Sequence, residues 1–64
     1  MKLFFEAIEK RMDEAEGEFI QTEVSSKKEA INDAAAYPKN RYTRRIHYCY
    51  HDENPSRPCT AEEI

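Results

Sequence analysis

The stretch SSKKEAINDAAAYP, residues 25–38, contains the best-marked helix start and stop in the chain. Ser26 followed three residues later by Glu29 has the spacing of a capping box, in which side chains bind free N–H groups at a helix start. An apolar stripe follows at helical spacing, formed by Ala30, Ile31, Ala34 and Ala35. Pro38 cannot continue a helix. The pattern predicts a helix over residues 26–37 whose narrow alanine face packs closely on a sheet.

The next segment, RYTRRIHYCYH at residues 41–51, has the alternation of a strand. One face carries Tyr42, Arg44, Ile46, Tyr48 and Tyr50, and the other carries Thr43, Arg45, His47, Cys49 and His51. We expect the first face to meet the core. Arg44 lies at its outer end, so its charged group has to reach past the helix.

Residues 1–25 fit two alternatives. The first is a helix, because apolar residues recur at helical spacing among strong helix formers, namely Leu3, Phe4, Ala7, Ile8 and Met12. The second is a β-hairpin with strands near residues 2–11 and 18–24, since Gly17 follows an acidic run and EFIQTEV then alternates. We choose the hairpin. It places Leu3, Phe5 and Ala7 on one face and Phe4 and Ile8 on the other, while the partner strand supplies Ile20 and Val24.

These elements predict a small α+β domain of order β-β-α-β over residues 1–51, an antiparallel sheet with one helix packed on one face. The alternative is α-β-α-β with an N-terminal helix. Residues 52–64 form a polar tail with Pro55 and Pro58, which we expect to be irregular, with a short helix start at Thr60 as a variant. A chain of 64 residues holds one domain and a small core. A disulfide, a metal or self-association as a homodimer would help such a chain to fold.

The net charge is −3, but the charges are unevenly distributed, with a basic segment between two acidic ones. Residues 39–51 contain four cations and no carboxylate, interleaved with tyrosines. Such a segment can dock an anionic partner or be neutralised by the protein's own acids, and of the two we favour the second. Candidate contact residues for a partner protein or a nucleic acid are Lys39, Arg41, Tyr42, Arg44, Arg45 and Tyr48. Nucleic-acid affinity would be weak and salt-sensitive with so few cations. The opposite candidate surface is an acidic hairpin tip with Asp13, Glu14, Glu16 and Glu18.

Catalysis is not expected. The chain is too short to enclose a pocket around an activated cysteine. It has a single glycine, which is too few for a glycine-rich phosphate loop. The soft metal ligands are His47, Cys49, His51 and Cys59. An extended His-x-Cys-x-His run spreads its ligands, so a shared zinc would require the strand to bend and the tail to bring Cys59 over. We therefore predict no metal and no cofactor. A zinc-stabilised mini-domain and a Cys49–Cys59 bridge are the alternatives.

The layout of residues 1–51 resembles small phage-encoded accessory proteins, among them anti-CRISPR and other anti-defence inhibitors. It consists of KLFFEAIEK at residues 2–10, then GEFIQTEVSSKKEAI at residues 17–31 with its strand-to-helix junction, then an Arg/Tyr-rich strand. The resemblance implies a phage or mobile-element origin and a non-enzymatic inhibitor that occupies the binding surface of a host complex. It assigns no residue. We therefore expect a cytoplasmic protein-binding accessory factor with a host or phage protein complex as partner and no membrane segment. The alternative is a nucleic-acid-binding module that uses the basic strand.

Overall fold

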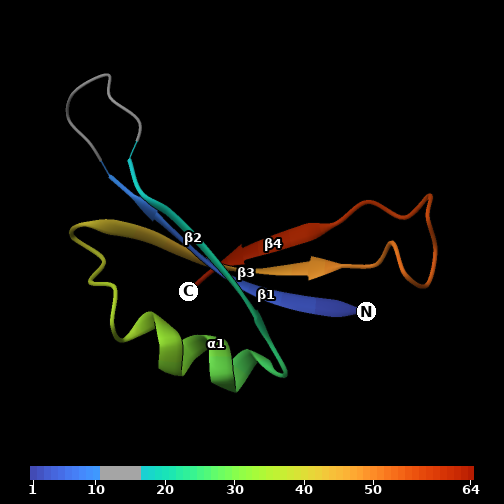
Figure 1. Cartoon of the computed structure of the whole chain (residues 1–64), viewed down its shortest axis with the longest axis horizontal. Coiled ribbons are helices and arrows are strands. Elements are labelled where there is room, and N and C mark those ends of the chain that lie inside the picture. Colours follow the sequence, from blue (N-terminus) through green and yellow to red (C-terminus); the bar gives the residue numbers. More distant parts are fainter. Residues whose placement is uncertain (11–16) are drawn as a thin grey trace.

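The computed structural model describes residues 1–10 and 17–64, which form a sheet and a helix (Figure 1). The elements are β1 (Lys2–Glu9), β2 (Phe19–Val24), α1 (Lys27–Ala34), β3 (Tyr42–Cys49) and β4 (Thr60–Glu63). All neighbouring strands pair antiparallel, in the order β2-β1-β3-β4. The predicted α+β class is confirmed. The N-terminal segment is a strand, so the alternative with an N-terminal helix is wrong.

The C-terminal tail differs from the expectation, because its last residues form β4 instead of an irregular segment or a helix start. Residues 60–63 pair with the edge of β3 that β1 leaves free, and the Ile64 N–H donates to the Arg44 carbonyl at 2.9 Å. The amino-acid sequence gives no signal for this strand. Thr-Ala-Glu-Glu has no apolar alternation, since all four residues are exposed and the strand is held by backbone hydrogen bonds.

The helix is shorter than predicted and ends at Ala34. The N–H groups of the next three residues donate to carbonyls three residues back instead of four, so the chain tightens into turns before Pro38. The apolar stripe is also narrower than expected. Ala30 and Ala34 are buried, whereas Ile31 is 52% exposed and Ala35 is exposed too.

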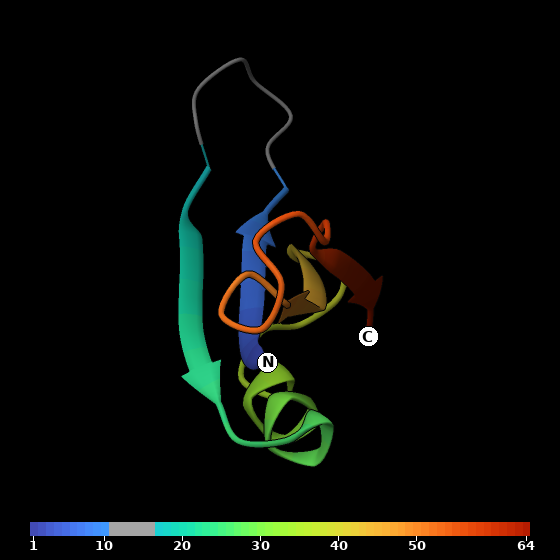
Figure 2. The same ribbon diagram turned by 90° about the vertical axis from the view of Figure 1, so that its right-hand side faces the viewer.

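Figure 2 shows α1 on one side of the sheet, and the core lies between the helix and that face of the sheet. Its buried side chains come from every element except β4 and are Phe5, Ala7, Val24, Ala30, Ala34 and Ile46. The predicted inward face of β3 carries the buried Ile46, and on β1 the buried side chains are Phe5 and Ala7, which the sequence places on one face. The alanines allow a close approach of helix and sheet, and Tyr37, Tyr42 and Tyr48 pack around the rim. No helix in the described ranges is long and apolar enough to cross a membrane.

The helix start uses the predicted capping residues, Ser26 and Glu29, but the Glu29 carboxylate binds Ser25 instead of Ser26. The Ser26 hydroxyl oxygen accepts from the Glu29 N–H at 3.2 Å. The Glu29 carboxylate accepts from the N–H and the hydroxyl of Ser25, at 2.8 and 2.5 Å, rather than from Ser26. These bonds join the end of β2 to the first turn of α1.

Acidification is expected to loosen this junction. The Ser25 hydrogen bonds lower the pKa of the Glu29 carboxyl from its ordinary value of 4.5. A carboxyl with a depressed folded pKa contributes stability above its unfolded pKa and loses that contribution as pH falls through the folded value. NMR titration should give a Glu29 pKa below 4.5 in the native chain and a higher one in Ser25→Ala. Equal values in the two proteins would contradict the assignment.

Candidate functional site

No helix or strand of residues 1–10 and 17–64 covers the sheet face opposite α1, and a buried carboxylate lies at the centre of this face. Glu6 of β1 is only 3% exposed. In the strand register Glu6 lies between Gln21 of β2 and Arg45 of β3. The Gln21 amide donates to one carboxylate oxygen at 2.9 Å, and the Arg45 Nε donates to the other at 2.8 Å. The His47 ring nitrogen Nδ1 lies 3.7 Å from the same carboxylate. The central acid of this face is thus satisfied within the protein.

The predicted basic contact residues are divided between the two faces of the sheet. Arg45 lies on the open face with Glu6. Arg44 lies on the helix face, where its guanidinium donates to the main-chain oxygens of Ala34, Tyr37 and Ile64 at 2.9 to 3.3 Å.

The other predicted basic-surface residues do not complete one platform. Tyr42 and Tyr48 pack against the core on the helix face. Lys39 and Arg41 are exposed in the α1–β3 connection. Arg41 lies 3.9 Å from Glu9, and the Lys39 carbonyl accepts from the Lys10 ammonium at 2.8 Å. Of the four predicted cations, Arg41 and Arg45 lie beside carboxylates of the protein.

Of the predicted acidic tip, Asp13, Glu14 and Glu16 lie outside the described residues. Glu18 is exposed, and its backbone is paired with Glu9. The Glu18 carbonyl accepts from the Glu9 N–H at 2.8 Å, while the Glu18 N–H donates to the Glu9 carboxylate at 3.2 Å.

The outer edge of β2 is a feature that the sequence reasoning missed. In antiparallel pairs, opposite residues alternate between positions that exchange backbone hydrogen bonds and positions that do not. The bond from Glu9 to Glu18 fixes this alternation. Phe19, Gln21 and Glu23 therefore turn their N–H and C=O groups away from β1, toward the outer edge of the sheet (Figure 2). The Phe19 side chain is 54% exposed.

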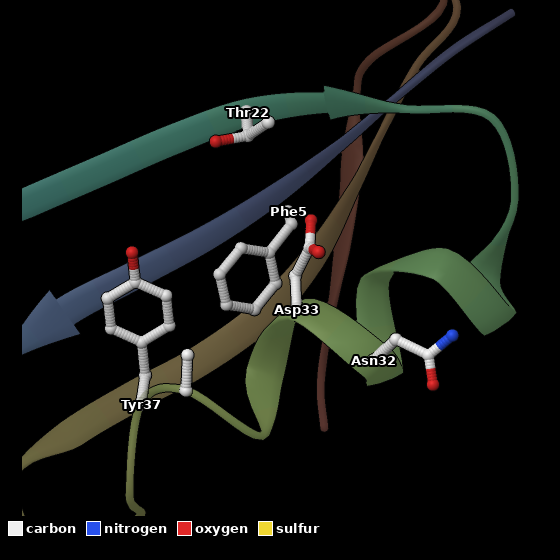
Figure 3. A pocket seen from close by; sticks show the side chains of 6 residues that line it. Phe5, Thr22, Asn32, Asp33 and Tyr37 are labelled. Carbon is white, nitrogen blue, oxygen red and sulfur yellow. The ribbon is translucent and has the colours of Figure 1, made fainter.

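A pocket of about 340 Å³ lies beside this edge, between β2 and the C-terminal end of α1. Figure 3 shows the rings of Phe5 and Tyr37 along it, with Thr22 of β2 above and Asn32 and Asp33 of α1 at its polar side. The rings are 5.6 Å apart between centroids. The Asp33 side chain is partly buried, and among the described residues it has no hydrogen-bond or ion-pair partner. The pocket thus combines aromatic walls with one free negative charge.

Three of the four predicted soft ligands come together at the far end of β3. The ligand atoms of Cys49, His51 and Cys59 lie within 4.8 Å of one another. The chain turns after Cys49, and the segment that leads into β4 brings Cys59 back. His47 is separate, because it lies beside Glu6 and edge-on to Phe4. Both cysteines are free thiols. Burial and the neighbouring Cys49 raise the pKa of the Cys59 thiol above its ordinary value.

No protein-family model, curated protein or solved structure matches the chain. The phage-inhibitor resemblance therefore stays a prediction.

Proposed function

We propose that this protein is a non-enzymatic protein-binding accessory factor that takes an extended segment of a partner protein as an additional strand on β2. The observation that supports this most is the outer edge of β2, whose backbone groups face outward beside a pocket that holds the Asp33 carboxylate, which has no partner in the described part of the chain. An exposed strand edge is a template for β-augmentation, in which main-chain hydrogen bonds give affinity and side pockets give specificity.

The two edges of the sheet differ in how well they resist such pairing. β4 has only four residues, two of them glutamates, and Lys27 of α1 forms an ion pair with Glu62 at 2.7 Å. Short, charged edge strands discourage pairing. β2 has six residues, of which only Glu23 is charged, and it presents the exposed Phe19. The β2 edge is therefore the receptive one.

The pocket defines the chemistry of the partner segment. A residue of the added strand opposite Thr22 would project toward the helix side, over the rings of Phe5 and Tyr37. A Lys or Arg at this position can lay its stem along the rings and place its cation at Asp33. Three residues further along, the position opposite Phe19 on the open face suits an apolar side chain. The predicted partner segment is thus β-prone, with a cation and an apolar residue three positions apart.

A second copy of this chain is a poorer occupant. The β2 sequence FIQTEV contains no Lys or Arg, so β2 of a second copy has no cation for Asp33. A symmetric antiparallel pairing centred on Gln21 would also set Phe19 opposite Glu23 twice. We therefore assign the edge to a different protein. In the phage setting this would be a host or phage complex in the cytoplasm, whose contact surface the accessory factor occupies as an inhibitor.

Direct nucleic-acid binding has less support. Stacking on single strands needs aromatic faces and cations along one groove. Here Arg44 and Arg45 lie on opposite faces, and each has protein partners.

The proposal is tested with synthetic heptapeptides of alternating Thr and Val that carry Lys in the middle and Ile three positions away. In ¹⁵N NMR at about 1 mM peptide, we expect shifts in β2 and at Asp33 in the native protein. Asp33→Asn should weaken binding about fivefold through the lost charge. A peptide with Glu in place of Lys should not bind.

Two proline variants supply the edge control. Glu23→Pro removes an N–H that points outward from β2, and Ala61→Pro removes one that points outward from β4. We expect only the first to abolish binding. The proposal fails if no Lys peptide shifts β2 resonances, or if both proline variants bind normally.

A further inference from the structure

The register of β3 and β4 places the two cysteines opposite each other. Tyr48 pairs with Thr60, so the next step along the same register sets Cys49 beside Cys59. The backbone bond from Ile64 to Arg44 fixes the alternation, and it makes this step a position without backbone hydrogen bonds. Side chains approach more closely at such positions. The two thiols thus meet because of the strand pairing.

The loop between them is held by contacts of its own. The Tyr50 carbonyl accepts from the N–H groups of Glu53 and Asn54, at 3.0 and 2.9 Å. The Arg57 guanidinium lies 3.7 Å above the centre of the Tyr50 ring, a cation–π contact. Asn54 accepts from both the N–H and the hydroxyl of Ser56. This loop returns the chain to Cys59 and keeps His51 between the thiols.

The two sulfur-to-nitrogen separations fit a tetrahedral ion. The His51 Nδ1 lies 3.7 Å from the Cys49 sulfur and 3.7 Å from the Cys59 sulfur. With Zn–S near 2.3 Å and Zn–N near 2.0 Å, tetrahedral angles require sulfur-to-nitrogen separations of about 3.6 Å. Two sulfurs and one imidazole select zinc-class ions over magnesium or calcium, which prefer oxygen.

We propose that Cys49, His51 and Cys59 bind one zinc ion, with a fourth position taken by water or by a donor from a bound partner. Each thiol binds as a thiolate and gives its proton to solvent, so two protons leave as one ion enters. Two thiolates and a neutral imidazole balance the charge of the ion. The bound ion would close the loop of residues 50–58 and fasten β4 to β3. This inference is independent of the partner segment at β2.

The test is a zinc titration of the reduced protein, followed by native mass spectrometry and thermal melting. We expect one zinc per chain, a higher Tm with zinc and loss of both on chelation. Cobalt(II) should give the intense visible bands of a tetrahedral site with a thiolate charge-transfer band. Absence of a one-to-one complex in reductant would overturn the proposal.

Variants distinguish this site from adventitious binding. Cys59→Ser and His51→Gln should each weaken zinc binding by about 100-fold or more, because each loses a direct ligand. His47→Gln is the matched control, since it removes the other histidine, which lies at Glu6, and should bind zinc normally. Circular dichroism of the metal-free variants checks that they fold. Equal zinc affinity in folded His51→Gln and native protein would refute the site.

Discussion

Phe5→Ala is expected to leave most of the protein unfolded. Phe5 is 1% exposed and is one of the two largest fully buried side chains in the described ranges. Truncating a buried Phe costs about 3 to 5 kcal/mol, through lost burial and the cavity that remains. A domain of this length rarely has more than about 3 to 5 kcal/mol of stability from its core. The ¹⁵N NMR spectrum should therefore collapse to the narrow dispersion of an unfolded chain.

Phe19→Ala is the control, because the Phe19 side chain is more than half exposed on β2. It should stay folded and lose less than about 1 kcal/mol. A well-dispersed Phe5→Ala spectrum with a similar urea midpoint would mean that the helix does not pack on the sheet as described.

Arg44→Met is expected to lower the free energy of unfolding by about 2 to 4 kcal/mol, since hydrogen bonds to charged groups are strong and buried acceptors are costly to leave unpaired. The Arg44 guanidinium binds two carbonyls at the end of α1 and the main-chain oxygen of Ile64. It therefore joins the helix, β3 and the chain after β4. Methionine keeps the apolar stem and removes only the donors.

Arg45→Met is the matched control for Arg44→Met, because it removes the neighbouring guanidinium on the open face of the sheet. Arg45 is 40% exposed and binds Glu6, which keeps Gln21 as a second partner. We expect a smaller loss, about 1 to 2 kcal/mol, because the buried Glu6 carboxylate keeps Gln21 as a donor and solvent reaches the Arg45 end of the pair. Urea denaturation of both variants checks the order. If Arg45→Met were the more damaging change, the assignment of Arg44 to the structure and Arg45 to the surface would be wrong.

Most of the fold follows from local patterns in the sequence. Alternation in residues 18–24 and 41–51 predicts two strands, and on the second it also predicts the face that meets the core. Residues 2–11 fit a helix as well as a strand, and the hairpin with residues 18–24 favours the strand that the structure shows. Pairing of Ser26 and Glu29 locates the helix start. The sequence does not predict β4, because this strand buries no side chain and therefore shows no apolar periodicity. The exposure of Ile31 is not predicted, because the helix contacts the sheet only through Ala30 and Ala34, and the other two members of the stripe, Ile31 and Ala35, face solvent.

The candidate sites depend more on tertiary pairing. Strand alternation separates Arg44 from Arg45, but only the cross-strand register shows that Arg45 meets Glu6. The approach of Cys49 and Cys59 requires β4, whose pairing returns the chain. The Asp33 pocket combines residues of β1, β2, α1 and the turn after α1, so no spacing of residues in the sequence predicts it.

Amide hydrogen exchange across β2 distinguishes an edge that is open to a partner strand from one that is covered. An open edge predicts alternation in the free protein, with fast exchange at Phe19, Gln21 and Glu23 and slow exchange at the three residues whose N–H groups face β1. The Lys-bearing peptide should slow the first set and leave the β4 amides unchanged. Protection of Phe19, Gln21 and Glu23 in the free monomer, or no slowing by the peptide, would contradict a strand-accepting edge.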